Sequence, residues 1–153
     1  MEELLKQAKL KALRLLTDMD RTEEQLRTKL KQKEYPDEIV EQAIEYVKSF
    51  GYVNDANYAR RFVESRKGSK SRKELCAALM QKGVCKEYVE EALSSCYGYG
   101  DELQTIRGLL AKKHFSSEHS SAEEKKKLMA YLVRKGFSYE SVRKVLEVSC
   151  WNA

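Results

Sequence analysis

The stretch "SRKELCAALMQKGVCKEYVEEAL" (71–93) decides the fold, because the chain carries two further versions of it. The others are "TEEQLRTKLKQKEYPDEIVEQAI" (22–44) and "KKKLMAYLVRKGFSYESVRKVL" (125–146). Apolar residues occupy matching places in all three: Leu26, Leu75 and Leu128; Leu30, Leu79 and Leu132; Val40, Val89 and Val142. The offsets are 49 and then 53 residues. Self-similarity at such a spacing indicates tandem structural repeats.

Local signals in each copy predict helix ends. A hydroxyl residue followed three residues later by Glu or Gln is the capping-box pattern, and it occurs at Thr22, Ser71 and Ser121. Gly83 and Gly136 stand where this helix should end, since glycine adopts the left-handed conformation at little cost. The first copy has Glu34 at that place, which predicts a less tight turn.

Each repeat has a further helix on either side of this one. Pro36 and Ser138 suit the start of third helices, while Asn54 or Asp55, and Asp101, suit caps of first helices. Since no segment alternates with period two, the fold class is all-α, with nine helices. We expect three tandem three-helix repeats, at 1–50, 51–98 and 99–153, that form an elongated, curved array. A unit of about 50 residues has a small core, so neighbouring units should support each other.

Composition narrows the function classes. The 153 residues are 35% charged, with a net charge of +5, which permits a polyanionic partner without requiring one. No nucleotide-binding, zinc-protease or serine-hydrolase motif is present, so we expect no enzyme activity and no cofactor. The four cysteines lack zinc-ligand spacing, which predicts no metal site and reduced thiols. The beginning of the chain resembles neither a signal peptide nor a membrane span, so we expect a cytoplasmic protein with no membrane contact.

The positive charge is unevenly placed. Residues 1–50 carry ten Lys or Arg and eleven Asp or Glu, whereas residues 51–97 carry nine and six, and residues 98–153 ten and seven. The densest basic clusters are Arg66 to Lys73, Lys112 and Lys113, Lys125 to Lys127, and Arg134 with Lys135. On a shared face they would form a stripe for a polyphosphate or an acidic groove.

Two other interpretations stay open at this point. Basic residues at helix ends are commonly solvated and suit the helix dipole. Three-helix units also resemble helix-turn-helix scaffolds, but third helices such as "KEYVEEALSS" (86–95) carry acidic residues where base and phosphate contacts should lie. This composition argues against sequence-specific DNA reading by those helices.

The chain resembles the RecX family, the regulatory proteins of the bacterial recombinase RecA. The residues that carry the resemblance lie in "FGYVNDANYARRFVESR" (50–66), "RKELCAALMQKGV" (72–84) and "YLVRKGFSYESVRKVL" (131–146), with support from "KALRLLTDMDRTEEQLRTKLKQKEY" (11–35). Three positions depart from the family's pattern. Asn54 replaces an aspartate, Glu34 a glycine and Lys135 an arginine.

The resemblance implies a non-enzymatic modulator that binds RecA, mainly as its filament on single-stranded DNA, and reduces ATP hydrolysis, strand exchange and co-protease activity. We expect a monomer with at most weak direct contact with DNA. Charge placement, rather than a motif, selects the contact candidates: Asp55, Arg60, Arg61, Arg66, Lys67, Lys70, Arg72, Lys73, Lys112, Lys113, Lys125, Lys126, Lys127, Arg134 and Lys135. The alternative is a helical-repeat protein that binds nucleic acid directly through the basic stripe.

Overall fold

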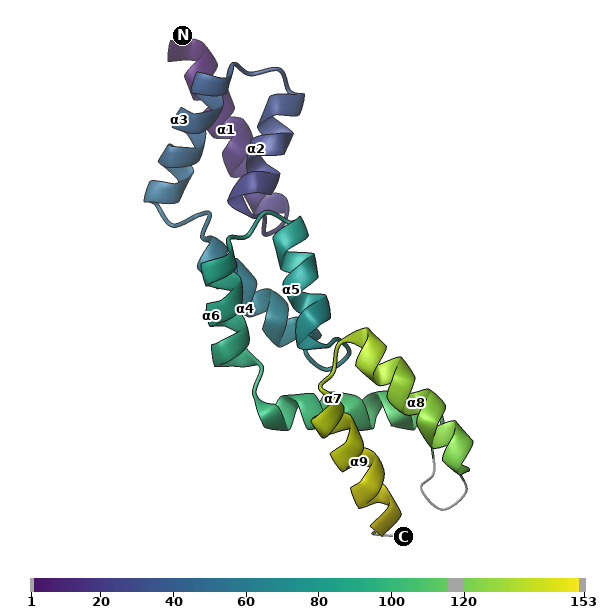
Figure 1. The fold of residues 1–153 in the computed structure, drawn as a ribbon. Helices are drawn as coiled ribbons and strands as arrows, with labels where there is room; N and C mark the ends of the chain where they lie inside the picture. Colours follow the sequence, from purple (N-terminus) through teal and green to yellow (C-terminus); the bar gives the residue numbers. More distant parts are fainter. Residues whose placement is uncertain (1, 116–119, 152–153) are drawn as a thin grey trace. The chain divides into compact units, whose positions relative to one another are not determined.

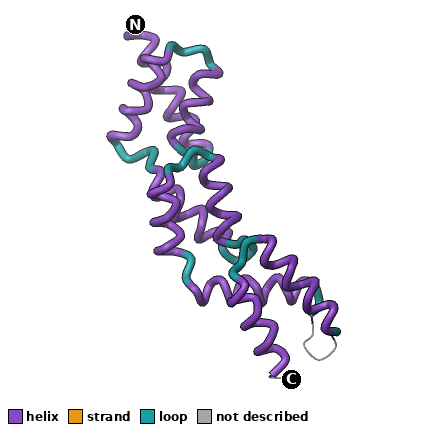
Figure 2. Tube along the Cα trace, viewed as in Figure 1, coloured by secondary structure: helices purple, strands orange, loops and turns teal. Residues whose placement is uncertain are grey.

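The computed structural model describes residues 2–115 and 120–151, with side chains described as far as residue 146. Within these ranges the chain forms nine helices and no strand (Figure 2). Figure 1 labels them α1 (Glu2–Asp18), α2 (Glu23–Gln32), α3 (Asp37–Ser49), α4 (Asp55–Arg66), α5 (Arg72–Gln81), α6 (Lys86–Cys96), α7 (Tyr99–Lys112), α8 (Ala122–Lys135) and α9 (Tyr139–Trp151). The predicted all-α fold of three-helix repeats is confirmed. The elongated outline and the repeat boundaries stay predictions.

Two of the three predicted capping boxes form as hydrogen-bonded pairs. Thr22 Oγ1 accepts from the Gln25 amide at 3.1 Å, and the Gln25 side chain accepts from the Thr22 amide at 3.1 Å. Ser71 and Glu74 make the same two bonds at the start of α5, at 3.1 and 3.0 Å. Ser121 Oγ accepts from an amide of the first turn of α8. The second helix of each repeat therefore begins where local chemistry predicts.

The turn that ends the second helix differs between the first repeat and the other two. Gly83 and Gly136 have φ angles of 89° and 119°, as predicted for left-handed residues. Glu34 also adopts a left-handed φ, of 66°, and its amide donates to the Lys31 carbonyl at 2.9 Å. The matching Gly83 bond is 3.0 Å. Val84 and Phe137, which follow the two glycines, also donate to the Leu79 and Leu132 carbonyls at 3.1 Å, whereas Tyr35 makes no equivalent bond to Leu30. The turn at Glu34 therefore has one hydrogen bond fewer than the other two, as expected for a less tight turn. A single residue can take the left-handed conformation at a cost of about 1–2 kcal/mol.

One helix-start prediction is wrong. Asp101 does not cap α7 from outside, since the helix begins at Tyr99 and Asp101 lies in its first turn. From there its carboxylate accepts from the Gly98 amide at 2.8 Å, so it supports the helix start in another way. Met19 follows the end of α1 and is 58% exposed. None of the described helices is long and apolar enough to cross a membrane.

The chain divides into two compact units, each containing part of the middle repeat. Unit 1 is Met1–Arg61 with Leu79–Glu91, and unit 2 is Phe62–Ala78 with Ala92–Ala153. The core of unit 1 contains Ala8, Ala12, Leu15, Leu26, Leu30, Ile39, Val40, Ala43, Ile44, Val47 and Val53. A core in unit 2 contains Leu103, Ile106, Leu110, Leu132, Phe137, Val142, Val145 and Leu146. Each core includes apolar positions that the repeat pattern marks: Leu26, Leu30 and Val40 in unit 1, and Leu132 and Val142 in unit 2.

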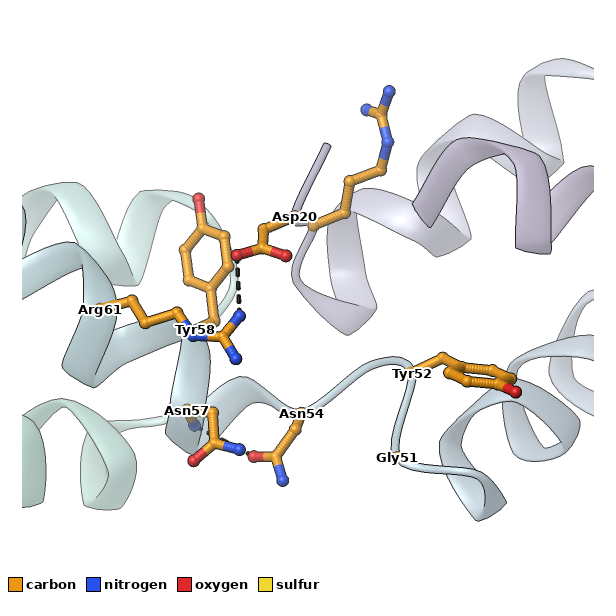
Figure 3. Close-up of a pocket in the computed structure, with 8 residues that line it drawn as sticks. Asp20, Gly51, Tyr52, Asn54, Asn57, Tyr58 and Arg61 are labelled. Atoms are coloured by element: carbon orange, nitrogen blue, oxygen red, sulfur yellow. Dashed lines mark hydrogen bonds and ion pairs between the residues drawn. The ribbon is translucent and has the colours of Figure 1, made fainter. Parts of the chain in front are cut away.

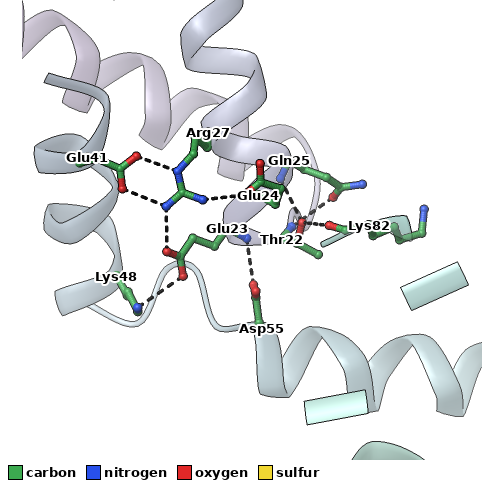
Figure 4. Close-up of polar contacts among 9 residues, drawn as sticks. All are labelled: Thr22, Glu23, Glu24, Gln25, Arg27, Glu41, Lys48, Asp55 and Lys82. Carbon is green, nitrogen blue, oxygen red and sulfur yellow. Dashed lines mark hydrogen bonds and ion pairs between the residues drawn. The ribbon is translucent and has the colours of Figure 1, made fainter. Parts of the chain in front are cut away.

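Unit 1 contains a contact between successive repeats, which we call the first joint: Thr22, Lys82 and Gly83. The Thr22 hydroxyl donates to the Lys82 carbonyl at 2.6 Å (Figure 4). Gly83 lies so close to α2 that a Cβ placed on it would be 2.4 Å from Glu24 Cβ. This turn therefore requires glycine for space as well as for its φ angle.

Unit 2 contains the equivalent second joint: Ser71, Lys135 and Gly136. The Ser71 hydroxyl donates to the Lys135 carbonyl at 2.8 Å, and a Cβ on Gly136 would lie 2.6 Å from Lys73 Cβ. The ammonium of Lys135 also pairs with Glu74 at 3.0 Å, where the first joint has Gln25 in place of a carboxylate. The same contact thus recurs in both units, with an added ion pair in the second.

Candidate interface around the basic connector

The basic connector, residues 66–73, joins the end of α4 to the start of α5, and its backbone is held by neighbouring side chains. The Tyr97 hydroxyl donates to the Lys70 carbonyl at 2.8 Å, and Thr105 Oγ1 donates to the Lys67 carbonyl. Tyr97 is only 1% exposed, and this burial raises the pKa of its hydroxyl to about 12. The connector is consequently a well-packed junction within unit 2.

Two of its cations take part in that packing. The Lys67 ammonium lies 3.2 Å from the Cys96 carbonyl and pairs with Glu64 at 3.3 Å and Asp101 at 3.4 Å. Arg72 donates to the carbonyls of the last turn of α6 and of Tyr97. These groups satisfy backbone oxygens at the end of α6, which is the usual place for a stabilising cation. Lys67 and Arg72 are therefore better explained as structural residues.

The remaining cations of the connector face solvent. Lys70 and Lys73 are exposed, and so is Arg66, whose Cζ lies 4.2 Å from the centre of the Phe62 ring. The second joint brings Lys73 against Gly136, two residues beyond Arg134 in the chain. The connector and the C-terminal end of α8 are therefore neighbours, which the sequence did not reveal.

Helix α8 carries the largest group of outward cations. Lys126, Lys127 and Arg134 are all exposed, and the spacing of seven between Lys127 and Arg134 returns to the same helix face. Lys125 is half-buried, and Lys135 is turned toward Glu74. We use the name outward set for the exposed cations of this region other than Arg66, which lies over the Phe62 ring, and Arg72, which donates to backbone carbonyls: Lys70, Lys73, Lys126, Lys127 and Arg134.

The other predicted contact residues lie outside the outward set, and some of them already contact a ring or a carboxylate of the protein. Lys112 is exposed at the end of α7, and the Lys113 ammonium lies 4.3 Å from the centre of the Tyr131 ring. The remaining three lie in unit 1. Arg60 pairs with Glu91, and Arg61 with Asp20 at 2.9 Å.

Asp55, the third of these, uses its side chain to stabilise the start of another helix. Its carboxylate accepts a 2.9 Å hydrogen bond from the Glu23 amide at the start of α2 (Figure 4). Burial raises the pKa of Asp55 despite this bond. Nearby, Arg27 pairs with Glu41 at 2.7 Å and with Glu24 at 2.7 Å, and these hydrogen bonds raise its pKa.

Sequence reasoning missed a polar hollow in unit 1 (Figure 3). Its lining comes from two separate segments: Asp20, Arg21, Gly51, Tyr52, Asn54, Asn57, Tyr58 and Arg61. The stretch from Gly51 to Arg61 supplies six of these eight residues, and Asp20 and Arg21 supply the other two. Tyr58 is half-buried, whereas Ala59 and Val63 on the same helix are fully buried.

No metal centre is formed in the part of the chain that the structure describes, since no group of three or more His, Cys, Asp or Glu lies together there. Cys76, Cys85 and Cys96 form no disulfide bond with one another, and the side chain of Cys150 lies outside the described residues.

The fold and these surfaces define an all-α repeat protein with a solvent-facing basic region. Family models match along the chain as the first three-helix domain of RecX at residues 8–46, the second at 54–93 and the third at 100–146. The chain belongs to the RecX family of regulatory proteins.

Relatives named regulatory protein RecX support this assignment. The protein of Caldanaerobacter subterraneus is 39% identical over 94% of this chain and 71% of its own length. That of Trichlorobacter lovleyi is 33% identical over 90% of this chain and 92% of its own length. The Clostridium beijerinckii protein is 30% identical, and the match spans only 65% of it.

Solved structures support the fold. The crystal structure of RecX from Lactobacillus salivarius has a TM-score of 0.86, with 23% identity, over 97% of this chain and 98% of that one. A second crystal structure, of a regulatory protein RecX, has a TM-score of 0.83 over 94% of this chain and 72% of that one.

Proposed function

We propose that this chain binds the recombinase RecA, mainly as its filament on single-stranded DNA, and reduces its ATP hydrolysis, strand exchange and co-protease activity. The observation that supports this most directly is the succession of three RecX domains along the chain. The protein acts without catalysis, as a cytoplasmic monomer. Its effect arises because it blocks growth of the filament or destabilises the filament.

The outward set is the proposed contact with the filament. A filament on single-stranded DNA presents phosphates, and exposed Lys and Arg residues neutralise them with release of counterions. Lys67, Arg72 and Lys135 contribute indirectly, since their pairs and hydrogen bonds hold the connector and the second joint in shape. We therefore assign contact with the filament to fewer cations than the density of charge along the sequence suggested.

The first test is the rate of ATP hydrolysis by RecA on single-stranded DNA, with sub-stoichiometric amounts of this protein. Affinity for the bare DNA is measured at the same salt concentration. Strong inhibition together with weak DNA binding is the expected result. Absence of inhibition at saturating concentrations would contradict the proposal.

A matched pair of variants tests the contact surface. One variant replaces four residues of the outward set with alanine: Lys70, Lys73, Lys127 and Arg134. The control replaces the same number of exposed cations in unit 1: Lys6, Arg14, Lys31 and Lys33. We expect the first variant to inhibit RecA less and with a weaker dependence on salt, and the control to act as the wild type. Equal inhibition by both variants would exclude the outward set.

Direct binding to nucleic acid is a second candidate function. The observation that favours it is the exposed basic face of α8, because a basic helix can lie along a phosphate backbone without a protein partner. This alternative predicts tight, steeply salt-dependent binding to bare DNA and no effect on RecA beyond competition for DNA. Excess DNA would then abolish the inhibition, whereas binding to RecA itself would preserve it.

A further inference from the structure

Three aromatic side chains of unit 1 form a group at the end of α3, which we call the aromatic cluster: Tyr46, Phe50 and Tyr52. The rings of Phe50 and Tyr52 stack with centroids 5.7 Å apart and planes at 22°, and Tyr46 meets Phe50 edge-on at 5.1 Å. Phe50 is 58% exposed and Tyr52 57%. In Figure 3 the Tyr52 ring is turned away from the other residues that line the polar hollow. Single apolar residues are common on protein surfaces, whereas grouped exposed rings mark places where another molecule binds.

The backbone that carries Phe50 and Tyr52 is fixed by the turn that ends α3. The Gly51 amide donates to the Lys48 carbonyl at 2.9 Å, and the Tyr52 amide donates to the Val47 carbonyl at 3.0 Å. These two bonds, with Gly51 in the left-handed conformation, make up the Schellman ending of a helix. Because the backbone already holds one conformation, a partner that covers the rings pays little entropy to order it.

This exposure is not a general property of the repeat. The residue that follows the third helix of the second repeat is also aromatic, but this Tyr97 is 1% exposed and its hydroxyl donates to the Lys70 carbonyl. Phe50 stands at the matching place after α3, yet more than half of it stays in water. Packing of the repeat therefore accounts for Tyr97 and not for the exposed part of the aromatic cluster.

The surroundings of the aromatic cluster carry little charge. Gln42 and Ser49 lie four residues before and three residues after Tyr46, so they share its face of α3, and both are exposed and uncharged. The Lys9 ammonium lies over the Tyr46 ring, 4.4 Å from its centre. Among the residues that the structure describes, no carboxylate pairs with Lys9. A single cation beside apolar rings complements a carboxylate that lies next to an apolar side chain.

This charge pattern separates the candidate occupants. A strand of nucleic acid needs several cations along its phosphates, as in the outward set, and one ammonium that lies on a ring does not supply them. A second copy of the chain would place the cluster against itself across a two-fold axis, which would bring the two Lys9 side chains together at a cost in binding energy. The surface of a different protein, with an apolar side chain next to a carboxylate, fits the cluster best.

We infer that the aromatic cluster is a docking surface for the RecA protein itself, and that it receives an apolar RecA side chain with a carboxylate beside it. The inference goes beyond the proposed function, which assigns only the phosphate contact of the outward set, and rests on it for the identity of the partner. The interaction then has two parts: burial of aromatic rings, which salt does not screen, and contact with phosphates, which salt weakens. Buried aromatic residues commonly supply much of the energy of an interface.

The test measures binding of the full chain to a RecA filament, assembled on an immobilised single-stranded oligonucleotide with a slowly hydrolysed ATP analogue. The Phe50→Ala/Tyr52→Ala variant should bind roughly thirtyfold more weakly, the effect of losing one interface hot spot. This loss should be the same at low and at high NaCl concentration. Tyr99→Ala/Tyr139→Ala is the matched control and should bind as the wild type does, because these two tyrosines of unit 2 are similarly exposed, at 53% and 61%.

A charge reversal tests for the carboxylate of the partner. Lys9→Glu should weaken binding to the filament by at least about tenfold, because two carboxylates would then face each other. Arg14→Glu makes the same change in net charge on another face of α1, since the two positions are five residues apart, and it should bind as the wild type does. Equal weakening by both substitutions would mean that net charge, rather than a contact at Lys9, sets the affinity, and would contradict the inference.

The inference and the proposed function can fail separately. Thermal unfolding establishes that the variants are folded, and Tyr52→Ala alone repeats the test with less disturbance of the helix end. If the folded Phe50→Ala/Tyr52→Ala variant binds the filament like the wild type, the docking surface is excluded even where the wild type inhibits ATP hydrolysis. If the wild type binds through the cluster but leaves ATP hydrolysis unchanged, the docking surface stands and the proposed function fails.

Two further measurements test the other occupants. An equal loss of affinity for the bare oligonucleotide in the Phe50→Ala/Tyr52→Ala variant would assign the cluster to nucleic acid. Sedimentation that shows a dimer for the wild type and a monomer for this variant would assign it to a second copy of the chain. Either result would overturn the inference. The expected results are unchanged affinity for the bare oligonucleotide and a monomer in both cases.

Discussion

The hydroxyl of Ser71 donates a 2.8 Å hydrogen bond to the carbonyl oxygen of Lys135, 64 residues further along the chain. The same hydroxyl accepts from the Glu74 amide as the N-cap of α5. Thr22 makes both kinds of bond, to Lys82 and within its own capping box. One side chain thus starts a helix and joins it to the next repeat, which links local helix formation to the packing of the units.

Replacement of Ser71 by alanine should destabilise the protein by about 1–3 kcal/mol. The residue is fully buried, and the change removes a cap and leaves the Lys135 carbonyl without this donor. Urea unfolding followed by circular dichroism measures the effect. Ser121→Ala is the matched control, because Ser121 caps α8 but is exposed, so its loss should cost about 1 kcal/mol or less. If the two variants lose the same free energy of unfolding, the hydrogen bond from Ser71 to Lys135 adds no stability beyond the helix cap.

Gly83→Ala should destabilise the protein by roughly 2–4 kcal/mol. The new Cβ would meet Glu24 Cβ at 2.4 Å, and the φ angle of 89° adds a conformational cost. Gly51→Ala separates the two effects, because its φ is 75° but nothing lies within 4 Å of its Cβ. That control should lose only about 1–2 kcal/mol in the same urea titration. If both variants unfold at the same denaturant concentration, the close contact with Glu24 does not add to the cost of a Cβ at position 83.

Glu34→Gly should stabilise the protein by about 0.5–1 kcal/mol. Glu34 has a φ of 66°, which is strained for a residue with a Cβ, and glycine relieves that strain at some cost in chain entropy. Thermal unfolding should therefore show a higher midpoint for this variant. Glu34→Ala serves as the control, since it removes the carboxylate but keeps the strain. A stabilisation by alanine equal to that by glycine would mean that charge, not conformation, explains the change.

Glu74→Gln should cost about 0.5–1 kcal/mol at pH 7 and progressively less in acid. Burial raises the pKa of Glu74, but the Ser71 amide and Lys135 outweigh it, and the pKa lies below its ordinary value of 4.5. A lowered carboxyl pKa contributes stability that is full above 4.5 and is lost as the pH falls through the folded value.

The measurement is the urea midpoint of wild type and Glu74→Gln between pH 7 and pH 3. Glutamine keeps the capping box, as Gln25 does in the first repeat, so the difference reports the ion pair with Lys135. Glu140→Gln, at an exposed position of α9, should show no such dependence. A gap between wild type and Glu74→Gln that stays constant down to pH 3 would contradict the assignment.

Helix type and most helix ends were predictable because their causes are local. Thr22 and Ser71 cap helices through residues three positions away, and Gly83 and Gly136 end them through their own φ angles. Asp101 was placed wrongly, because a carboxylate can support a helix start from outside the helix or from its first turn. Spacing along the chain does not distinguish these two places.

The candidate site was predictable only as a set of charges. The sequence alone determined the repeats, the helical class and the positions of the cations, because these depend on residue type and short spacing. Tertiary structure decided that Lys67 and Arg72 satisfy carbonyls near the end of α6 while Lys70 and Lys73 face solvent. It also decided the joints and the hollow beside Tyr52, since each is built from segments distant in sequence, and only packing determines which of them meet.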